Sequence, residues 1–176
     1  MAMTALEKAL NKVTKDFKES FPNILEAARV KKIPMSSPKL NYVFGGGGFA
    51  AGRIAEFAGL EGGGKTTTAT IVAAEIQKRP KQNKVIFIDF EYALDIDHAQ
   101  NLGLDISDAR EGGKLLFLRP VSGEDVFNIL EELLPTEEFG LVIWDSVATS
   151  PTAAMVQNDV SKCVGPSTQV SFKVLE

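Results

Sequence analysis

The stretch Arg53-Ile-Ala-Glu-Phe-Ala-Gly-Leu-Glu-Gly-Gly-Gly-Lys-Thr-Thr-Thr-Ala-Thr70 decides the fold of this chain. Within it, residues 59–66 read glycine, four residues of any type, glycine, lysine and threonine, which is the pattern of a phosphate-binding loop. Residues 54–58 cluster apolar side chains as a buried strand does, and residues 66–78 are typical of a helix. Because strand, glycine-rich turn and helix are the context that this loop requires, the stretch predicts a nucleotide site.

The residue types in the loop suit the binding of a polyphosphate. The glycines at 62–64 have no side chains and reach positive φ, so successive backbone N–H groups can converge on phosphate oxygens. The helix that follows adds its free N–H groups and the positive end of its dipole. Lysine supplies a charge for the outer phosphates, and the threonine hydroxyl can ligate Mg²⁺. The predicted nucleotide contacts are Gly59, Leu60, Glu61, Gly62, Gly63, Gly64, Lys65, Thr66 and Thr67.

Length and composition favour one main domain in the 176 residues, with a substantial core. The net charge is −4 with both signs spread along the chain, so no bulk electrostatic attraction to nucleic acid or membrane is expected. The single cysteine, Cys163, excludes an internal disulfide and fits a reducing compartment. The sequence has neither a membrane-length apolar run nor a signal-peptide block, so we expect a cytoplasmic protein without membrane association.

Residues 1–35 are expected to form a helical arm and linker ahead of a core domain at 36–176. The arm has a predicted helix at 4–19 and a second helical piece at 23–31, and prolines and serines at 34–38 indicate a linker. The apolar face of the first helix comprises Leu6, Leu10, Val13 and Phe17. Either the basic residues of this helix simply form a solvated face, or its apolar stripe packs on a neighbouring subunit.

Beyond the loop, strands and helices alternate. Strands are predicted at 84–90, 114–118 and 140–145, and helices at 95–101 and between Ser122 and Pro135. Ser122 is expected to cap its helix, with an acidic residue three positions on. This alternation is the pattern of an α/β fold with a doubly wound, mainly parallel sheet flanked by helices.

Two regions give weak signals. The glycines at 45–48 lack the lysine and threonine of the later loop and predict only a flexible turn. After Thr149 we expect a helix to begin at 153–155, a polar loop at 157–169 and another helix at 170–176.

Carboxylates lie where two predicted strands end, which is the edge at which open α/β sheets bind ligands. Asp145 follows Leu-Val-Ile-Trp and is expected to associate with Mg²⁺, as in phosphate-loop NTPases. Glu91 is the candidate for positioning and polarising the attacking water. The alternative makes Asp89 the active group and Glu91 a surface residue.

The segment Phe87-Ile-Asp-Phe-Glu-Tyr-Ala-Leu-Asp95 closely resembles the Phe-Ile-Asp-Ala-Glu-His-Ala-Leu-Asp segment of bacterial RecA recombinases. The resemblance is carried in the same order by residues 45–48, 52–54, 59–67 and 144–148. Lys32-Ile-Pro-Met35 also resembles the segment before the core in phage recombinases of the UvsX type. From residue 32 to about 155 the chain thus looks like a RecA-family recombinase of the phage type.

This resemblance implies a P-loop NTPase of the RecA type that uses ATP and Mg²⁺. Lys65 and Thr66 would contact phosphate and magnesium, and Lys65 would also serve catalysis. Glu91 would be the catalytic base that orients water, and Asp145 the carboxylate associated with magnesium.

The family pattern also assigns the base, the arm and the DNA contacts. Asp95 matches a position that contacts the adenine amino group, and His98 falls where the family usually has a tyrosine stacked on adenine. The N-terminal helix would be an arm that docks on the next subunit of a filament. Single-stranded DNA would bind through loops, the first at 157–169, where Lys162 and Gly165 are candidates.

The family further implies a strand between the phosphate-loop strand and the Asp145 strand, contributed by residues after 176. Without that strand the sheet would leave two unpaired edges facing each other, which is costly. We therefore expect these 176 residues to bind nucleotide weakly at best and to lack full recombinase activity.

The leading hypothesis is the ATPase core of a recombinase that forms ATP-dependent filaments on single-stranded DNA and exchanges strands in recombination and repair, in the cytoplasm of a bacterial host. One alternative is another RecA-fold ATPase, such as a replicative helicase motor or an accessory ATPase. Another is a nucleotide-binding fragment without turnover.

Overall fold

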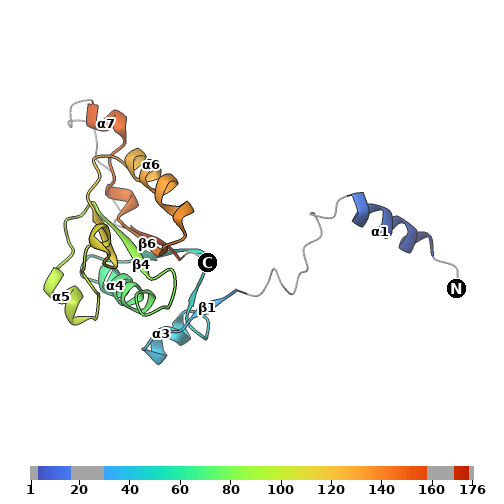
Figure 1. The fold of residues 1–176 in the computed structure, drawn as a ribbon, viewed down its shortest axis with the longest axis horizontal. Coiled ribbons are helices and arrows are strands. Elements are labelled where there is room, and N and C mark those ends of the chain that lie inside the picture. The colour runs from blue at the N-terminus through green and yellow to red at the C-terminus, as the bar shows by residue number, and fades with distance from the viewer. Residues whose placement is uncertain (1–3, 17–29, 158–168, 175–176) are drawn as a thin grey trace. The chain divides into compact units, whose positions relative to one another are not determined.

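The computed structural model describes residues 4–16, 30–157 and 169–174 (Figure 1). The chain divides into two compact units, residues 1–31 and residues 32–176. The division lies ahead of the linker expected at 34–38 rather than within it. In the described part of the chain, no helix has the length and apolar character needed to cross a membrane.

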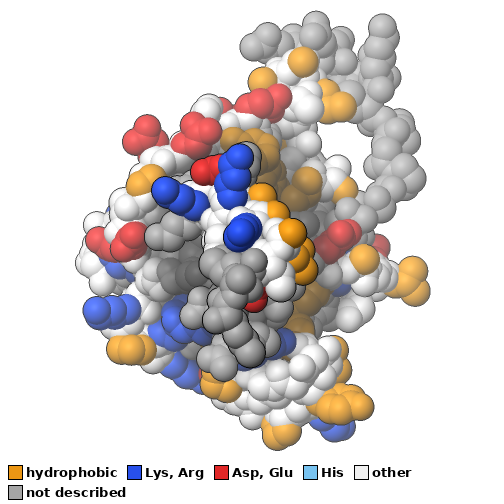
Figure 2. Space-filling view, turned by 90° about the vertical axis from the view of Figure 1, so that its right-hand side faces the viewer, with side chains coloured by type: hydrophobic (Ala, Val, Ile, Leu, Met, Phe, Trp, Pro, Cys, Tyr) orange, Lys and Arg blue, Asp and Glu red, His pale blue; other side chains and the backbone are white. Residues whose placement is uncertain are grey.

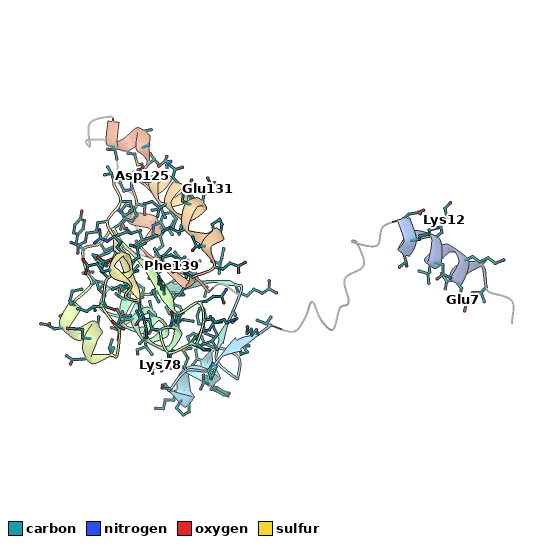
Figure 3. The ribbon with its side chains drawn as sticks, in the orientation of Figure 1. Glu7, Lys12, Lys78, Asp125, Glu131 and Phe139 are labelled. Atoms are coloured by element: carbon teal, nitrogen blue, oxygen red, sulfur yellow. The ribbon has the colours of Figure 1, made fainter. Side chains whose placement is uncertain are left out.

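The first unit contains helix α1, Ala5–Asp16. Thr4 and Glu7 form a reciprocal cap at its start: the Glu7 N–H donates to Thr4 Oγ1 at 3.2 Å, and the Thr4 N–H donates to Glu7 Oε2 at 2.6 Å. Two free N–H groups at the helix start are satisfied in this way. Glu7 and Lys12 both project from α1 in Figure 3.

The predicted apolar face of α1 is exposed, and no residue of the helix is buried. The exposed fractions are 68% for Leu6, 51% for Leu10 and 41% for Val13. Phe17 and nearly all of the second helical piece at 23–31 lie outside the described residues.

The second unit is built on a five-stranded sheet with the order β3-β7-β6-β4-β5. The strands are β3 Ile54–Ala58, β4 Lys84–Asp89, β5 Leu115–Leu118, β6 Phe139–Asp145 and β7 Gln169–Val174. β4 pairs in parallel with β5 and β6, whereas β7 pairs antiparallel with both β3 and β6. The sheet is therefore mainly parallel, as predicted, with β7 running against the others.

Helices cover both faces of this sheet. The main helices are α4 Lys65–Ile76, α5 Ile96–Asn101, α6 Gly123–Leu133 and α7 Ala153–Gln157, with 3₁₀ turns at 109–111, 134–136 and 147–149. α4 and α6 lie on opposite sides of β4 and β6 (Figure 1). Alternate residues of β4 accordingly enter two cores: Val85 and Phe87 pack with α4, and Ile86 and Ile88 pack with α6.

Helix α6 begins with the cap that the sequence predicts at Ser122. Ser122 Oγ accepts from the Asp125 N–H at 3.2 Å, and Asp125 Oδ2 accepts from the Ser122 N–H at 3.0 Å. Asp125 lies in the first turn of the helix, and Phe139 opens β6 (Figure 3). α6 ends at Leu133, just before Pro135.

The linker predicted at 34–38 is wrong, because this region is folded onto the core. The region contains strand β1 Lys32–Ile33, helix α3 Pro38–Val43 and strand β2 Phe49–Ala50, and β1 pairs antiparallel with β2. The Asn41 side chain holds the Met35 backbone through bonds of 2.7 and 2.8 Å, and Met35 is buried. Ser37 caps α3 and Pro38 occupies its first turn, so the proline and serine that suggested a linker are helix-start residues.

The expectation that residues 54–58 form a buried strand is wrong about burial. β3 is an edge strand of the described sheet, and its residues alternate between exposed and half-buried, with Ile54 75% exposed. Phe57 faces inward and stacks on Phe44, with 6.1 Å between the ring centroids. Only the face of β3 toward α3 and α4 is covered.

Two predictions about the end of the chain are also wrong. The helix expected at 170–176 is strand β7, and Val-Ser-Phe-Lys-Val at 170–174 has the alternation of a strand. β7 lies in the gap expected between β3 and β6, so those two strands do not face each other unpaired. The physical reason given for weak nucleotide binding is thereby removed. Residues 158–168, most of the expected DNA loop with Lys162 and Gly165, lie outside the described residues.

The glycine turn makes one close backbone approach. Gly48 has φ +112°, and a Cβ placed there would overlap the Ile33 carbonyl. We expect Gly48→Ala to lower the free energy of unfolding by about 3 kcal/mol or more, because backbone strain and overlap add. Gly46→Ala is the matched control, since Gly46 has φ +79° but no atom near its Cβ position, and about 1 kcal/mol is expected. Equal losses for the two variants in urea unfolding would contradict the overlap argument.

Candidate nucleotide-binding site

The loop between β3 and α4 is curled rather than extended. Gly62 and Gly64 have φ of +70° and +82°, and the Gly63 N–H donates to the Leu60 carbonyl at 3.1 Å. A Cβ at Gly63 would lie 2.9 Å from that carbonyl oxygen. α4 starts at Lys65 without a side-chain cap, so N–H groups of its first turn are available to an anion.

Lys65 folds back over the loop. Its Nζ donates to the carbonyls of Gly59 and Leu60 at 3.2 and 3.1 Å. Leu60 and Glu61 are exposed, and Thr67 is half-buried in the first turn of α4. The ammonium group thus lies at the rim of the loop, where a phosphate would meet it.

Thr66 and Asp145, which are 79 residues apart in the sequence, meet at the end of β6. The Thr66 hydroxyl donates to Asp145 Oδ2 at 2.6 Å. Asp145 is only 1% exposed, and its other oxygen, Oδ1, has no hydrogen-bond partner among the described residues. The structure thus brings together the two side chains predicted to hold Mg²⁺. The peptide bond that follows Asp145 is cis.

The Asp145 carboxyl lies in an environment that disfavours its charge. Burial raises the pKa of Asp145 above its usual range, and the hydrogen bond from Thr66 opposes that rise. The negative charges of Glu91 and Asp89 raise the pKa further, while the charge of Lys65 lowers it. A buried carboxylate beside two others is an arrangement that a bound cation would stabilise.

Glu91 and Asp89 differ in what they contact. Asp89 is 1% exposed, and its two oxygens accept from Arg119 Nη2 at 3.1 Å and from the Ala93 N–H at 3.3 Å. Glu91 Oε1 is buried and has no partner in the described part of the chain. Asp89 and Asp145 are register partners at the ends of β4 and β6, and Glu91 lies two residues after Asp89. Asp89 is therefore engaged, whereas Glu91 is available to a ligand.

Asp95 and His98 are placed on a different element from the loop. Asp95 caps α5, where its Oδ1 accepts from the His98 N–H at 2.9 Å, and both residues are exposed. Within the described ranges, no hydrogen bond or ion pair joins either side chain to residues 59–67. The structure therefore does not bring these two into contact with the phosphate loop.

The sequence reasoning missed Arg119 and Tyr92. Arg119 comes directly after β5 and reaches the same strand-end edge as Asp89 and Asp145. Its guanidinium carbon lies 4.4 Å from the centroid of the Tyr92 ring. The rule that ligands meet the carboxyl ends of parallel strands was applied to β4 and β6, and its application to β5 would have found Arg119.

The donor set fits magnesium held mainly by a nucleotide. Among the described residues, no group of three or more His, Cys, Asp and Glu side chains is arranged to hold a metal alone. Mg²⁺ in phosphate sites keeps several waters and takes few protein ligands. The Thr66 hydroxyl and the unpartnered Asp145 Oδ1 meet that requirement.

A wrapped glycine loop that opens a helix beside a carboxylate-ended parallel strand defines an α/β phosphate-loop nucleotide-binding domain. Comparison with known proteins narrows this class. The chain matches the RecA N-terminal domain over residues 4–171 and belongs to that family.

Similar proteins agree with this match. The chain is 36% identical to Protein RecA of Ehrlichia ruminantium (strain Gardel) over 159 residues, which cover 89% of this chain and 42% of that protein. It is 38% identical to Protein RecA of Heliobacterium modesticaldum over 162 residues, which cover 90% of this chain and 44% of that protein. For Protein RecA of Aquifex pyrophilus the identity is 38% over 149 residues, which cover 83% of this chain and 40% of that protein. The chain thus spans about two fifths of the length of these curated relatives.

Proposed function

We propose that this chain is the nucleotide-binding core of a DNA recombinase, which binds and hydrolyses ATP and forms filaments on single-stranded DNA for strand exchange. The observation that carries the proposal is the bond between Thr66 and Asp145 at the foot of the wrapped loop. The family match favours a recombinase over a helicase motor or an accessory ATPase.

ATP would bind with its phosphates on the loop. The N–H groups of Gly62, Gly64 and the start of α4 would hold the phosphate oxygens. Lys65 would exchange its two carbonyl partners for the outer phosphates, which gives its ammonium a charged partner. Mg²⁺ would neutralise phosphate charge beside Thr66 and Asp145.

Glu91 would orient the water that attacks the outer phosphate. This role is supported by its buried, unpartnered Oε1 and by the engagement of Asp89 with Arg119. A general base must be free to accept a proton or a hydrogen bond from water. We also propose Asp95 and His98 as contacts of the adenine base, which would need to extend from the loop to α5.

DNA binding and assembly are the remaining parts of the proposal. On the face in Figure 2, acidic and basic side chains both occur, so DNA contact would be local rather than driven by bulk charge. The exposed apolar stripe of α1 supports self-association through this arm. The segment at 32–35 supports a phage-type recombinase that acts in the cytoplasm of a bacterial host.

We expect the protein to form filaments on single-stranded DNA with MgATP, visible by electron microscopy. Leu10→Glu should raise the protein concentration needed for filaments about tenfold or more, because it places a charge in the apolar stripe that the arm would bury on the next subunit. Lys12→Gln on the polar side of α1 is the matched control and should form normal filaments. Absence of ATP-dependent filaments for the unaltered protein would refute the recombinase proposal, and normal filaments with Leu10→Glu would refute only the arm.

A further inference from the structure

Arg119 contacts the turn that carries Glu91 on both sides of it. Its Nη2 donates to Asp89 Oδ2 at 3.1 Å. Its Cζ lies 4.4 Å from the centroid of the Tyr92 ring and 5.0 Å from that of Phe117. Asp89 precedes Glu91 by two residues and Tyr92 follows it directly, so one guanidinium group holds both sides of the turn.

This turn depends on such contacts. Tyr92 has φ +57°, in the left-handed region that non-glycine residues seldom adopt. Tyr92 is 69% exposed, so packing in a core does not hold it. A residue in a strained conformation persists where its surroundings over-determine it. The contacts that hold Tyr92 are those of the Asp89 carboxylate, which accepts from the Ala93 N–H at 3.3 Å, and of the Arg119 guanidinium, which lies over the ring.

Asp89 in turn is paired with Arg119. Asp89 is 1% exposed, whereas the Arg119 side chain is 41% exposed. Burying a carboxylate away from water is costly, and a nearby cation offsets much of that cost. Asp89 is also the register partner of Asp145, so the cation moderates repulsion between two neighbouring strand ends.

We propose that Arg119 is a positioning residue for ATP hydrolysis: it neutralises Asp89, holds Tyr92 and thereby fixes the Glu91 carboxylate beside Asp145. This inference rests on the proposed role of Glu91 in orienting the attacking water. The chemistry favours arginine here, because a planar guanidinium can donate to a carboxylate at its edge while its face lies on a ring.

The first test is Arg119→Gln in the full chain, assayed with MgATP and single-stranded DNA. We expect kcat to fall about tenfold or more, because a misplaced group costs rate, while KM for ATP changes less than about twofold. Without nucleotide, hydrogen exchange at the Ala93 amide should become faster. Arg110→Gln, which removes the exposed partner of Asp108, is the matched control and should leave kcat, KM and the exchange rate at Ala93 unchanged.

Tyr92 gives a second pair of variants that avoids the buried carboxylate. Tyr92→Ala removes the ring that Arg119 covers and should lower kcat about two- to fivefold. Tyr92→Phe keeps the ring and should retain the kcat of the unaltered protein. Because Tyr92 is exposed, this pair remains informative even where Arg119→Gln fails to fold.

A double-mutant cycle separates positioning from a structural role. If Arg119 acts through Glu91, adding Arg119→Gln to Glu91→Gln should cause no further loss of turnover. Multiplied losses, an unchanged kcat for both Arg119→Gln and Tyr92→Ala, or a change in KM alone would overturn the inference. An impaired Glu91→Gln enzyme beside an unimpaired Arg119→Gln enzyme would overturn the inference and leave the proposed function standing. Unchanged turnover in Glu91→Gln would instead overturn the proposed hydrolytic role itself.

Discussion

Replacing Glu91 with glutamine should lower ATP turnover by about 10²-fold or more while leaving ATP affinity within about twofold of its original value. The amide keeps the size of the side chain but removes the charge that would draw a proton from water. Affinity should persist, because the loop amides, Lys65 and Thr66 are unchanged. The measurements are steady-state hydrolysis with single-stranded DNA and equilibrium binding of a fluorescent ATP analogue.

Two further variants serve as controls for the assignment of this role to Glu91. Glu111→Gln changes an exposed glutamate in the 3₁₀ turn at 109–111 and should retain full turnover. Asp89→Asn tests the rival assignment, and we expect it to lower the melting temperature, because it removes the buried carboxylate that pairs with Arg119. Normal turnover in Glu91→Gln, together with a stable but inactive Asp89→Asn protein, would transfer the catalytic role to Asp89.

The parts of the fold that follow from local sequence were predictable. The loop at 59–66 and the Ser122 cap depend on residue types at fixed spacing, and the structure has both. The apolar runs of β4 and β6 indicated parallel strands covered on both faces, and they lie side by side at the centre of the sheet. The convergence of Thr66 and Asp145 followed from the rule that parallel strand ends share one edge.

The errors share one cause, which is that tertiary pairing outweighs local signals. Pro38 and its neighbours look like a linker, but Asn41 and a buried Met35 fix them to the core. β3 has the composition of a buried strand but lies at the edge of the described sheet. The segment 169–174 forms a strand because β3 and β6 offer it two hydrogen-bonding edges. None of these partners is visible from the local sequence.

In the candidate site, too, residues that belong to local sequence patterns were predictable, whereas those defined by tertiary contacts were not. Lys65, Thr66 and Asp145 were found because each belongs to a motif with fixed spacing. Arg119 is reached only by applying the strand-end rule to β5, since its partner Asp89 lies 30 residues away and no motif joins them. The choice between Glu91 and Asp89 likewise needed the contacts, since both are carboxylates at one strand end.

Asp145→Asn should have opposite effects on stability and on function. Because burial and neighbouring carboxylates raise the pKa of Asp145 in the folded protein, the folded state binds more protons than the unfolded state between the usual and the raised pKa. Stability therefore falls as pH rises through that window, and the deficit persists at neutral pH. Asparagine has no charge to bury, so the nucleotide-free variant should be more stable than the original at neutral pH and lack this part of the pH dependence.

The same substitution should weaken Mg²⁺-dependent ATP binding or turnover by about 10- to 100-fold, because the carboxylate that orients the metal's surroundings is lost. Thermal unfolding from about pH 3 to pH 7 and hydrolysis over a range of Mg²⁺ concentrations measure the two effects. Asp105→Asn is the control of opposite sign: hydrogen bonds from Ser107 lower the pKa of Asp105, so its contribution to stability is lost as pH falls, and its removal should destabilise the protein at neutral pH. An Asp145→Asn protein that is less stable without nucleotide, or that hydrolyses ATP normally, would mean that this buried carboxylate serves the fold rather than the metal.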